Sequence, residues 1–444
     1  MKIGDKLEVL VEGMDKDGKG IAYFNKKIIF IEGAIINEKC EIVITKVLSK
    51  LIEAKVIKII TPSPDRLVPD CQIYENCGGC NLRHLSYDLE KKIKKNKVFN
   101  TIKHTTKLVN FKMNDIISNN KINHYRNKAI VPFSEVDGKI ICGMFKPHSH
   151  KIVDNTFCLI EPILLEDILI KIKAYLSQNN ISIYDETTKK GLFRAVMCRK
   201  TKSDDYMIVL IVTKNYDFSG LVDILKENRQ IKSIYLNIND LNTNVLLGNK
   251  NILIYGDKTI KENILNHNFL VSPNTFMQVN NKMAELLYTE ALRMLGPNLN
   301  TTIIDAYCGM GSISLSLASK VKKVIGIEVV ESAILDARKN AKLNNITNAS
   351  FILGKCEDKI LEVLTNNKVD AMVFDPPRKG CETSFLEAVI KSKIKRIVYI
   401  SCNIATLARD IKYLSPYYDL VEVTPVDMFP RTSHVETVAL LNIK

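Results

Sequence analysis

The sequence contains no apolar run of the ~20 residues that a membrane-spanning helix requires. Its first residues, MKIGDKLEVLVEG, also lack the uninterrupted apolar core of a secretory signal peptide. We therefore expect a cytoplasmic protein with no membrane partner. A glycine-rich phosphate loop ending in Lys-Ser or Lys-Thr is missing as well, which excludes the P-loop nucleoside triphosphatases.

Internal repeats and low-complexity tracts are absent from the 444 residues. At a rough density of one domain per ~150 residues, this length predicts about three domains. Because no exposed heptad or apolar stripe indicates an oligomer, we expect a monomer.

Basic residues outnumber acidic ones, and most of the excess lies in the first two thirds of the chain. The net charge is +14, and residues 1–300 hold 44 of the 63 basic residues but only 33 of the 49 acidic ones, a net of +11. Such a balance favours a polyanionic partner such as nucleic acid, and the alternative is an ordinary solvated basic surface.

A disulfide framework is not expected, because the eleven cysteines occur in a chain without a signal peptide and therefore indicate metal or catalytic roles. Three of them form the cluster Cys71-x5-Cys77-Gly-Gly-Cys80. Three thiolates leave one coordination position unfilled, so a fourth ligand must come from farther away. Cys158 is the first candidate and Cys142 the second. All-thiolate ligation suits zinc or an iron-sulfur cluster, and the spacing does not distinguish them.

Residues 1–60 alternate short β-forming runs with glycine turns, which is typical of a small β-barrel of the oligonucleotide-binding type. The expected strands are Lys6–Val11, Gly20–Phe24, Lys27–Ile31, Cys40–Val47 and Ala54–Ile60. The segment resembles the TRAM domain, an RNA-binding module of this shape. In that interpretation four lysines contact the RNA backbone: Lys16, Lys19, Lys26 and Lys27.

A proline-rich linker, Thr61-Pro-Ser-Pro-Asp65, opens the second domain, which we assign to residues 61–270 with an α+β fold. Near its start, a helix beginning at about Ser86 is expected to present lysines on a solvated face. These lysines are Lys91, Lys92, Lys94, Lys95, Lys97, Lys103 and Lys107.

From residue 271 to residue 444 the pattern becomes an alternation of strands and helices, which predicts a Rossmann-like α/β domain. The strand Thr302–Asp305 ends in a glycine turn, and Glu328 stands at the tip of the next strand, where its carboxylate can hold a ribose diol. A third strand ends in Asp375-Pro-Pro, whose stiff backbone fixes a loop beside the same edge. The run Ile397–Ile400 places Cys402 at a fourth strand tip.

Taken together, these motifs resemble the bacterial RNA (uracil-5-)-methyltransferase family, in particular the branch that modifies 23S ribosomal RNA. The resemblance runs essentially from end to end. The matching motifs are the barrel, the four cysteines, Phe276-Met-Gln-Val-Asn280, Asp305-Ala-Tyr-Cys-Gly309, Asp375-Pro-Pro-Arg-Lys-Gly380, Ser401-Cys-Asn403 and His434-Val-Glu-Thr437.

The resemblance implies two cofactors. S-adenosylmethionine would bind near Gln278, Tyr307, Glu328 and Asp375. A 4Fe-4S cluster would be held by Cys71, Cys77, Cys80 and Cys158. It also implies that part of about residues 86–120 packs on the catalytic domain, which makes the domains discontinuous.

Methylation at C5 of uracil needs a nucleophile and a base, because the ring carbonyls make C5 a poor nucleophile on its own. We assign Cys402 as the thiolate that adds to C6, with Arg409 and the following helix terminus expected to favour the anion. Glu436 is the expected base that removes the C5 proton, with His434 as the second candidate. Phe276 is either a core aromatic or a surface on which a base stacks once the uridine has been extruded.

The predicted activity is therefore methylation of C5 of a uridine in 23S ribosomal RNA through a covalent Cys402 adduct. Two alternatives remain open at this point. One is a transfer-RNA T-loop uracil-5-methyltransferase, whose branch typically lacks the barrel and the cysteine cluster. The other is a non-catalytic iron-sulfur protein that binds RNA or senses redox state.

Overall fold

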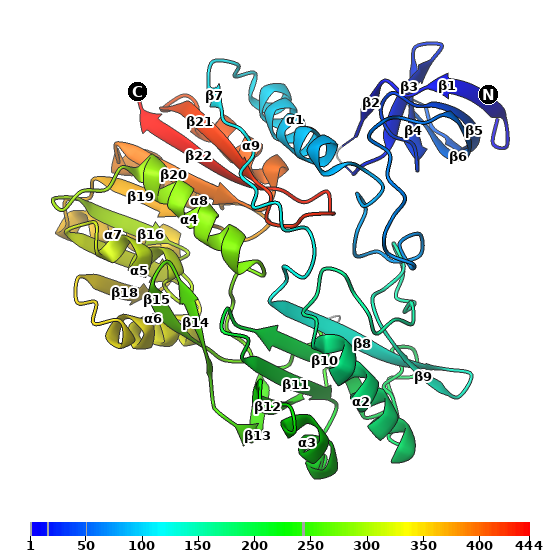
Figure 1. Cartoon of the computed structure of the whole chain (residues 1–444). Coiled ribbons are helices and arrows are strands. Elements are labelled where there is room, and N and C mark those ends of the chain that lie inside the picture. The colour runs from blue at the N-terminus through cyan, green and yellow to red at the C-terminus, as the bar shows by residue number, and fades with distance from the viewer. Residues whose placement is uncertain (1, 16, 50, 242–244) are drawn as a thin grey trace.

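The computed structural model describes residues 2–15, 17–49, 51–241 and 245–444, so Lys16, one of the four lysines expected to contact RNA, lies outside the described residues. Figure 1 shows a small β-domain at the N-terminus, a central domain with one sheet, and a larger α/β domain that contains the C-terminus. No described helix is long and apolar enough to cross a membrane.

The N-terminal domain is a six-stranded sheet that curls around its own apolar core (Figure 1). Its order is β1-β5-β6-β4-β3-β2, and its core includes Val9, Ile29, Ile42 and Ile52. The bounds are β1 Lys6–Leu10, β2 Gly13–Met14, β3 Gly20–Phe24, β4 Lys27–Glu32, β5 Lys39–Val47 and β6 Leu51–Thr61. The predicted small barrel is confirmed, and β2, too short to show a periodicity, is the strand that the sequence did not predict.

The central domain has a six-stranded sheet of order β13-β12-β11-β10-β8-β9, with two helices on one face. The strands are β8 Lys128–Val136, β9 Lys139–Cys142, β10 Phe193–Lys200, β11 Tyr206–Val212, β12 Ile231–Ile238 and β13 Lys250–Gly256. The helices are α2 Leu165–Gln178 and α3 Ser219–Lys226. The opposite face of the sheet, with Ala195, Met197 and Val209, shares a core with the catalytic domain.

The catalytic domain follows a hairpin, β14 (Ile260–Ile264) and β15 (His267–Val271), and has an eight-stranded sheet of order β18-β17-β16-β19-β20-β22-β21-β7. The eight strands of this sheet are β7 Lys112–Met113, β16 Thr302–Ala306, β17 Lys323–Glu328, β18 Ala349–Leu353, β19 Ala371–Phe374, β20 Arg396–Ser401, β21 Tyr418–Val426 and β22 Glu436–Ile443. The predicted Rossmann-like α/β fold is confirmed. The strand order reverses between β16 and β19, and ligands bind at such a switch point.

Helices cover both faces of this sheet. They are α4 Asn281–Leu295, α5 Ser312–Ala318, α6 Glu331–Leu343, α7 Cys356–Asn366, α8 Thr383–Ser392 and α9 Ile404–Leu414. Residues of α4 to α6 pack on one face around Ile303 and Val398, and residues of α7 to α9 pack on the other around Ile304 and Ile397. This leaves the carboxyl edge of the strands free for a site.

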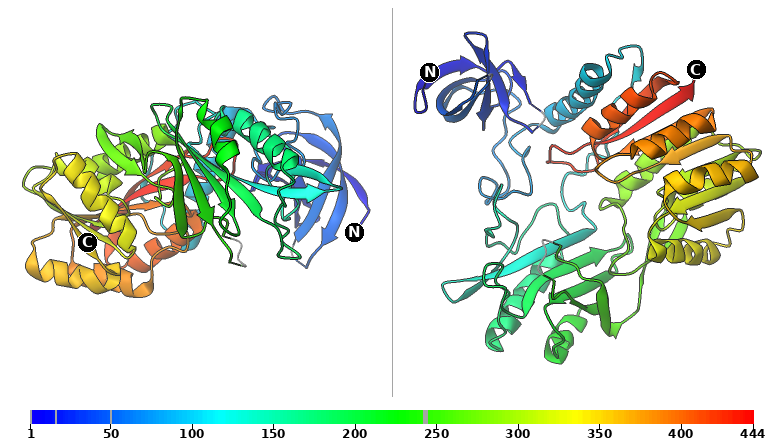
Figure 2. Two further views of the ribbon diagram at one scale, coloured as in Figure 1. Left: turned by 90° about the horizontal axis from the view of Figure 1, so that it is seen from below. Right: turned by 180° about the vertical axis from the view of Figure 1, so that it is seen from behind.

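One helix far away in the sequence joins the catalytic domain. Helix α1 (Tyr87–Thr106) begins with Ser86 as its N-cap and lies against the catalytic domain (Figure 2). Its Val98 and Ile102 share an apolar core with Ile411 of α9. Strand β7 then extends the catalytic sheet beside β21. The chain thus runs from the barrel through the catalytic domain before it forms the central sheet.

Candidate active site

The two predicted catalytic residues meet at the carboxyl edge of the catalytic sheet. Cys402 directly follows β20, and Glu436 is the first residue of β22. Ser401 pairs with Thr437 in the antiparallel register of these strands, so the next pair in that register is Cys402 and Glu436. Asp375 directly follows β19, the parallel neighbour of β20. Three strand ends therefore place a thiol and two carboxyl groups in one site.

The environment of Cys402 disfavours the thiolate in the ligand-free protein. Burial, followed by the charges of Glu436 and Asp375, raises the pKa of this thiol to about 11, and Arg378 opposes the shift. The expectation that the site favours the anion is therefore wrong for the ligand-free state. A proton acceptor is needed before the thiol can act as a nucleophile.

The neighbouring carboxyl groups have pKa values close to neutral. Burial raises the pKa of Glu436 to about 8, with Asp375 as the second cause. Burial, followed by the charge of Asp305, raises the pKa of Asp375 to about 7. Glu436 is 2% exposed, and its Oε2 atom has no hydrogen-bond partner among the described residues. Near neutral pH the two groups together exchange protons readily, as paired acid-base residues do.

The cation that acts on this site is Arg378, to which the sequence assigned no role. Its carbonyl oxygen accepts a hydrogen bond from Asn403 Nδ2 at 3.0 Å, which ties the loop after Asp375-Pro-Pro to the start of α9. Its guanidinium lies 3.3 Å from His434 Nδ1. Arg409, the expected cation, instead pairs with Asp410 at 2.7 Å and donates to Cys381 O at 3.0 Å. In the sequence, the position of Arg378 directly after Asp-Pro-Pro could have indicated that it lies near the site.

His434, on the loop that leads into β22, lies next to Arg378. Partial desolvation and the cations Arg378, Lys97 and Lys94 lower the pKa of His434. The imidazole is therefore neutral at pH 7 and chemically able to accept a proton.

The ends of β16 and β17 form the expected nucleoside side of the site. The Oε2 atom of Glu328 accepts a hydrogen bond from Gly309 N at 3.1 Å, and Oε1 accepts from Val329 N and Val330 N at 2.9 Å each. These bonds fix the carboxylate at the strand tip with lone pairs left over. Val329 and Val330 remain 56% and 51% exposed. A fixed acceptor beside an apolar surface fits a ribose and its base.

Tyr307 and Gln278 are the other two residues expected near the cofactor. Tyr307 follows β16 with a φ of 62°, a left-handed conformation that a non-glycine residue adopts only when its surroundings require it. Gln278 is 8% exposed, and its backbone oxygen accepts a hydrogen bond from Asn127 Nδ2 at 2.9 Å. Phe276, two residues earlier, is 77% exposed, so the core reading of this aromatic is wrong.

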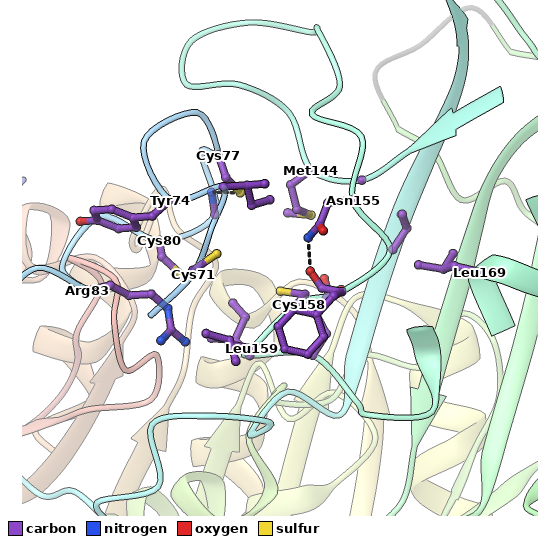
Figure 3. A pocket seen from close by; sticks show the side chains of 17 residues that line it. Cys71, Tyr74, Cys77, Cys80, Arg83, Met144, Asn155, Cys158, Leu159 and Leu169 are labelled. Carbon is purple, nitrogen blue, oxygen red and sulfur yellow. Dashed lines mark hydrogen bonds between the residues drawn. The ribbon is translucent and has the colours of Figure 1, made fainter. Parts of the chain in front are cut away.

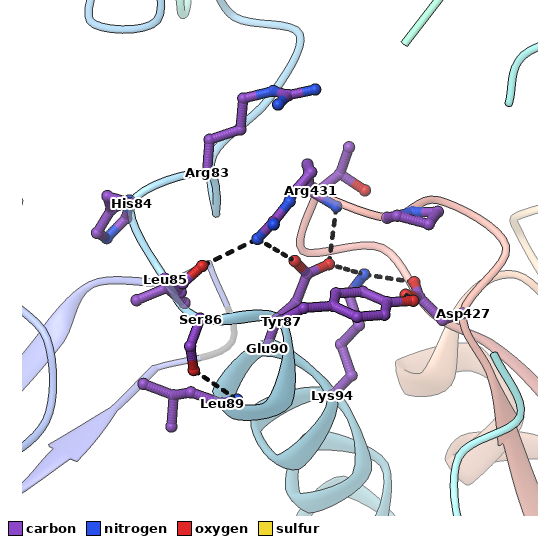
Figure 4. A network of polar contacts seen from close by, with 12 residues as sticks. Arg83, His84, Leu85, Ser86, Tyr87, Leu89, Glu90, Lys94, Asp427 and Arg431 are labelled. Atoms are coloured by element: carbon purple, nitrogen blue, oxygen red, sulfur yellow. Dashed lines mark hydrogen bonds and ion pairs between the residues drawn. The ribbon is translucent and has the colours of Figure 1, made fainter. Parts of the chain in front are cut away.

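The loop before Glu436 is held by a buried ionic network with helix α1 (Figure 4). Lys94 Nζ lies 2.7 Å from Glu90 Oε1, 2.6 Å from Asp427 Oδ1 and 3.1 Å from Phe429 O. Arg431, with a φ of 69°, donates its backbone N–H to Glu90 at 2.8 Å. Lys94 is 1% exposed, which departs from the solvated face expected for the lysines of this helix.

We expect Lys94→Met to lower the free energy of unfolding by about 3–5 kcal/mol, because it leaves Glu90 and Asp427 buried without their shared cation. The measurement is denaturant unfolding. Lys92→Met, at an exposed position of the same helix, is the matched control and should stay within about 0.5 kcal/mol of the wild type. Equal losses in the two variants would contradict the assigned role of the network.

The four cysteines expected to bind a metal line one pocket (Figure 3). Cys71, Cys77 and Cys80 come from the loop after β6, and Cys158 comes from the segment after β9. Cys142 is fully buried and is not among the lining residues. Within the described part of the chain, no three Cys, His, Asp or Glu side chains are grouped as they would be around one metal ion.

The pocket nonetheless brings four thiols to one place, with Glu161 also in its lining. Four thiols that face a common space without converging on one point fit a multi-atom cluster better than a single zinc ion, whose ~2.3 Å bonds draw the sulfurs together. Burial raises the pKa of Cys158 to about 12, and it also raises the pKa values of Cys77 and Cys80. A bound cation would reverse these shifts.

Asn81, the residue that follows Cys80, connects the cysteine pocket to the loop before Glu436. Asn81 N and Leu82 N both donate to Arg431 O at 3.1 Å. Asn81 Nδ2 donates to Ser433 Oγ at 3.1 Å, and Ser433 N donates back to Asn81 Oδ1 at 2.8 Å. Asn81 Nδ2 also lies 3.2 Å from Asp17 O of the barrel. One short segment therefore joins the barrel, the cysteine pocket and the catalytic domain.

Comparisons with known proteins agree with this geometry. Residues 87–444 match the family model of tRNA (uracil-5-)-methyltransferases, and residues 1–57 match that of the TRAM domain. An RNA methyltransferase of Staphylococcus aureus is 40% identical over 98% of this chain and 97% of its own length. One of Fusobacterium nucleatum is 38% identical, covering 100% and 97%. The structure of the Pyrococcus abyssi tRNA (uracil-54, C5)-methyltransferase in complex with S-adenosyl-L-homocysteine superimposes with a TM-score of 0.77 at 25% identity, covering 98% and 99%.

Proposed function

The chain belongs to the tRNA (uracil-5-)-methyltransferase family, with an N-terminal TRAM domain and S-adenosylmethionine as methyl donor, and we propose that it methylates C5 of a uridine in 23S ribosomal RNA through a covalent adduct. The observation that carries the proposal is the convergence of Cys402, Glu436 and Asp375 at one edge of the sheet. This edge lies at the switch point of the strand order.

In the proposed reaction the Cys402 sulfur forms a bond to C6 of the extruded uracil, and the C5–C6 π electrons move to C5 and O4. The thiol proton passes to the Asp375–Glu436 pair, whose pKa values near neutral suit it as an acceptor. The enolate makes C5 nucleophilic enough to take a methyl group. When bound, S-adenosylmethionine supplies that group on a positively charged sulfur.

After the transfer, Glu436 removes the hydrogen of C5. The electron pair of that C–H bond re-forms the C5–C6 double bond, and the bond between C6 and the Cys402 sulfur breaks. The carboxyl pair returns one proton to the leaving thiolate and releases the other to solvent. His434, neutral at pH 7, is the second candidate for the base. Arg378, near the carboxyl groups and the thiol, supplies the positive charge that an oxyanion at O4 requires.

For the cofactor, we propose that Glu328 accepts hydrogen bonds from the ribose hydroxyl groups. This assignment rests on its fixed carboxylate at the tip of β17. Tyr307, Gln278 and Asp375 surround the remaining part. Extrusion of the uridine costs a few kcal/mol, and the exposed ring of Phe276 offsets part of it by stacking with a base, which contributes about 1–3 kcal/mol.

We further propose that Cys71, Cys77, Cys80 and Cys158 hold a 4Fe-4S cluster. The proposal is supported by the four thiols that line a single pocket. Such a group would supply a rigid cross-link between two chain segments that are far apart in the sequence. Zinc on the same four thiolates is the alternative.

Anaerobically purified protein is expected to be brown, to absorb near ~400 nm and to contain about four iron atoms per chain. Cys80→Ala should lose the chromophore and most of the iron, because a ligand is removed. Cys142→Ala, outside the pocket, should keep both. Metal analysis and absorption spectroscopy provide the measurement, and stoichiometric zinc without iron would contradict the cluster assignment.

The substrate assignment is tested with hypomethylated 23S RNA and with transfer-RNA transcripts, offered separately to the purified enzyme with labelled methyl donor. We expect methylation of the 23S RNA, and mass mapping would then identify the uridine. Transfer RNA as the sole methylated substrate would overturn the assignment.

The transfer-RNA alternative is favoured by one specific observation. The Pyrococcus abyssi tRNA (uracil-54, C5)-methyltransferase covers 98% of this chain. The architecture of the chain, barrel included, is therefore shared with an enzyme of that specificity, and the presence of the barrel does not discriminate between the two RNAs.

A further inference from the structure

Two basic side chains lie directly opposite each other in the central sheet. Lys128 of β8 and Arg199 of β10 are partners in the antiparallel register of these strands. Side chains in such a pair are ~5 Å apart at Cβ, and like charges in this position destabilise a sheet. The fold therefore retains an arrangement that costs stability.

Arg199 differs from every other buried cation in the described residues. The buried basic residues are Arg83, Lys94, Arg194, Arg199 and Arg431. Four of them form an ion pair with a carboxylate: Arg83 with Asp70, Lys94 with Glu90, Arg194 with Glu186, and Arg431 with Glu90. Arg199, only 2% exposed, donates through Nη2 to Pro273 O and Thr275 O, while its Nε and Nη1 atoms have no partner among the described residues.

The surroundings of Lys128 add positive charge rather than remove it. Burial lowers the pKa of Lys128 to about 8, and the further causes are the charges of Arg199 and Arg126. No carboxylate contributes to the shift of Lys128 or of Arg199. The acidic group near Arg126 is Glu161, so Arg126 is partly compensated and the excess charge lies at the cross-strand pair.

The pair faces the catalytic domain. Along β10, Arg199 alternates with Cys198 and shares its face with Met197, which belongs to the core between the two domains. The carbonyl groups that Arg199 binds belong to the segment 273–275, directly before the exposed ring of Phe276. Asn127, next to Lys128, binds the backbone of Gln278 and Val279 in the same segment. The positive charge thus lies beside an exposed aromatic ring and the active-site edge.

We propose that Lys128 and Arg199, with Arg126 at the rim, form a binding site for a phosphodiester group of the RNA substrate next to the extruded nucleotide. Lys128, which is half-buried, contacts the phosphate, and the buried Arg199 on the neighbouring strand adds positive charge to the site. A cationic site beside an aromatic surface is the usual arrangement for binding single-stranded nucleic acid. The inference rests on the proposed function in that it takes RNA as the substrate.

The test compares Lys128→Gln and Arg199→Lys with Lys200→Gln. Lys200 is the next residue of β10, points to the other face and pairs with Asp204 at 2.6 Å. Lys200→Gln therefore removes the same charge from a neighbouring position outside the proposed site. Binding of a 23S RNA fragment and of a transfer-RNA transcript is measured in parallel over a range of salt concentrations. Affinity for S-adenosylhomocysteine is measured by calorimetry.

For Lys128→Gln we expect RNA affinity to fall about 10-fold, and the slope of log affinity against log salt to decrease by ~0.7–0.9, the value for one phosphate contact. Arg199→Lys keeps the charge and should give a smaller loss. Affinity for S-adenosylhomocysteine should not change. Since Lys128→Gln also removes the like-charge pair, its thermal stability without RNA should equal or exceed that of the wild type.

Several results would overturn the proposal. RNA affinity and salt slope equal to those of Lys200→Gln would exclude a phosphate contact. A loss confined to S-adenosylhomocysteine would assign the pair to the cofactor's carboxylate. A lower melting temperature together with weaker binding of both ligands would assign it a structural role. Because binding is measured with both RNAs, an error in the substrate assignment would appear as methylation of the other RNA and leave this test intact.

Discussion

Replacing Cys402 with alanine is expected to abolish methyl transfer, by roughly 10⁴–10⁶-fold, as removal of a covalent nucleophile does in other enzymes. Without the sulfur, no enolate forms and C5 of uracil stays electron-poor. Transfer of labelled methyl groups to RNA gives the rate. RNA that contains 5-fluorouridine at the target should form a complex with the wild type that survives denaturing electrophoresis. The base can remove hydrogen from C5 as a proton but cannot remove fluorine as a cation, so the bond between C6 and sulfur is not broken. The variant should form none.

The control for this experiment is Cys198→Ala. Cys198 is fully buried in β10, away from the strand ends that form the site, so its loss tests whether cysteine removal as such impairs the enzyme. We expect near-normal transfer and normal trapping in the control. Methyl transfer retained in Cys402→Ala would remove this residue as the nucleophile. An inactive wild type would favour the alternative of an RNA-binding protein without catalytic activity.

The second large effect is expected for Glu436→Gln, which should slow turnover by about 10²–10⁴-fold. The adduct between Cys402 and uracil can still form, but the C5 proton has no acceptor, so elimination stops. The variant should therefore accumulate a covalent complex with unmodified RNA, which the wild type resolves. Denaturing electrophoresis measures the complex. If His434 is the base instead, His434→Gln will accumulate it and Glu436→Gln will not.

Because the pKa of Glu436 is raised, Glu436→Gln should lower the catalytic rate without lowering the stability of the fold. The folded state holds the proton up to about pH 8, whereas the ordinary value is 4.5, so the folded state binds more protons than the unfolded state between these values. Stability is therefore fully present below about pH 4.5 and decreases as the pH rises towards 8. Glutamine is neutral at every pH and avoids this loss, so the variant should be at least as stable as the wild type at pH 7–8.

The same pKa predicts the pH dependence of the wild type. A base must be ionised, and Glu436 ionises as the pH rises through about 8. We expect kcat/KM to increase with pH up to this value, because the thiol of Cys402, with a pKa raised to about 11, also needs an ionised acceptor. A rate that falls between pH 6 and pH 8 would contradict this assignment of the base.

The strand ends and the residue types that stand at them were predictable from the sequence because they are local. The apolar run Ile397–Ile400 ends at Ser401 as predicted, and Asp-Pro-Pro follows β19. Helix α4 begins at Asn281, directly after its N-cap Asn280, and ends at Leu295, directly before Gly296. Each of these features is set by the alternation, propensity and capping of neighbouring residues, which is the information that a single segment contains.

The charges around those residues were not predictable, because they depend on contacts between distant segments. Lys94, in a run that indicates a solvated face, is buried against Asp427, 333 positions away. Arg409 is three residues closer to Cys402 than any other cation of α9, but its contact with Asp410 removes it from the thiol, and Arg378 from another loop takes its place.

The sequence by itself thus determined the fold class, the cysteine at a strand tip and the cluster of Cys71, Cys77 and Cys80. Only the tertiary structure placed Cys158 rather than Cys142 beside those cysteines, raised the pKa of Cys402 and brought Glu436 near Asp375. It also placed Lys128 opposite Arg199. The physical reason is that secondary structure follows from short-range propensities, whereas pKa values and ion pairs follow from distances that strand register and domain packing set.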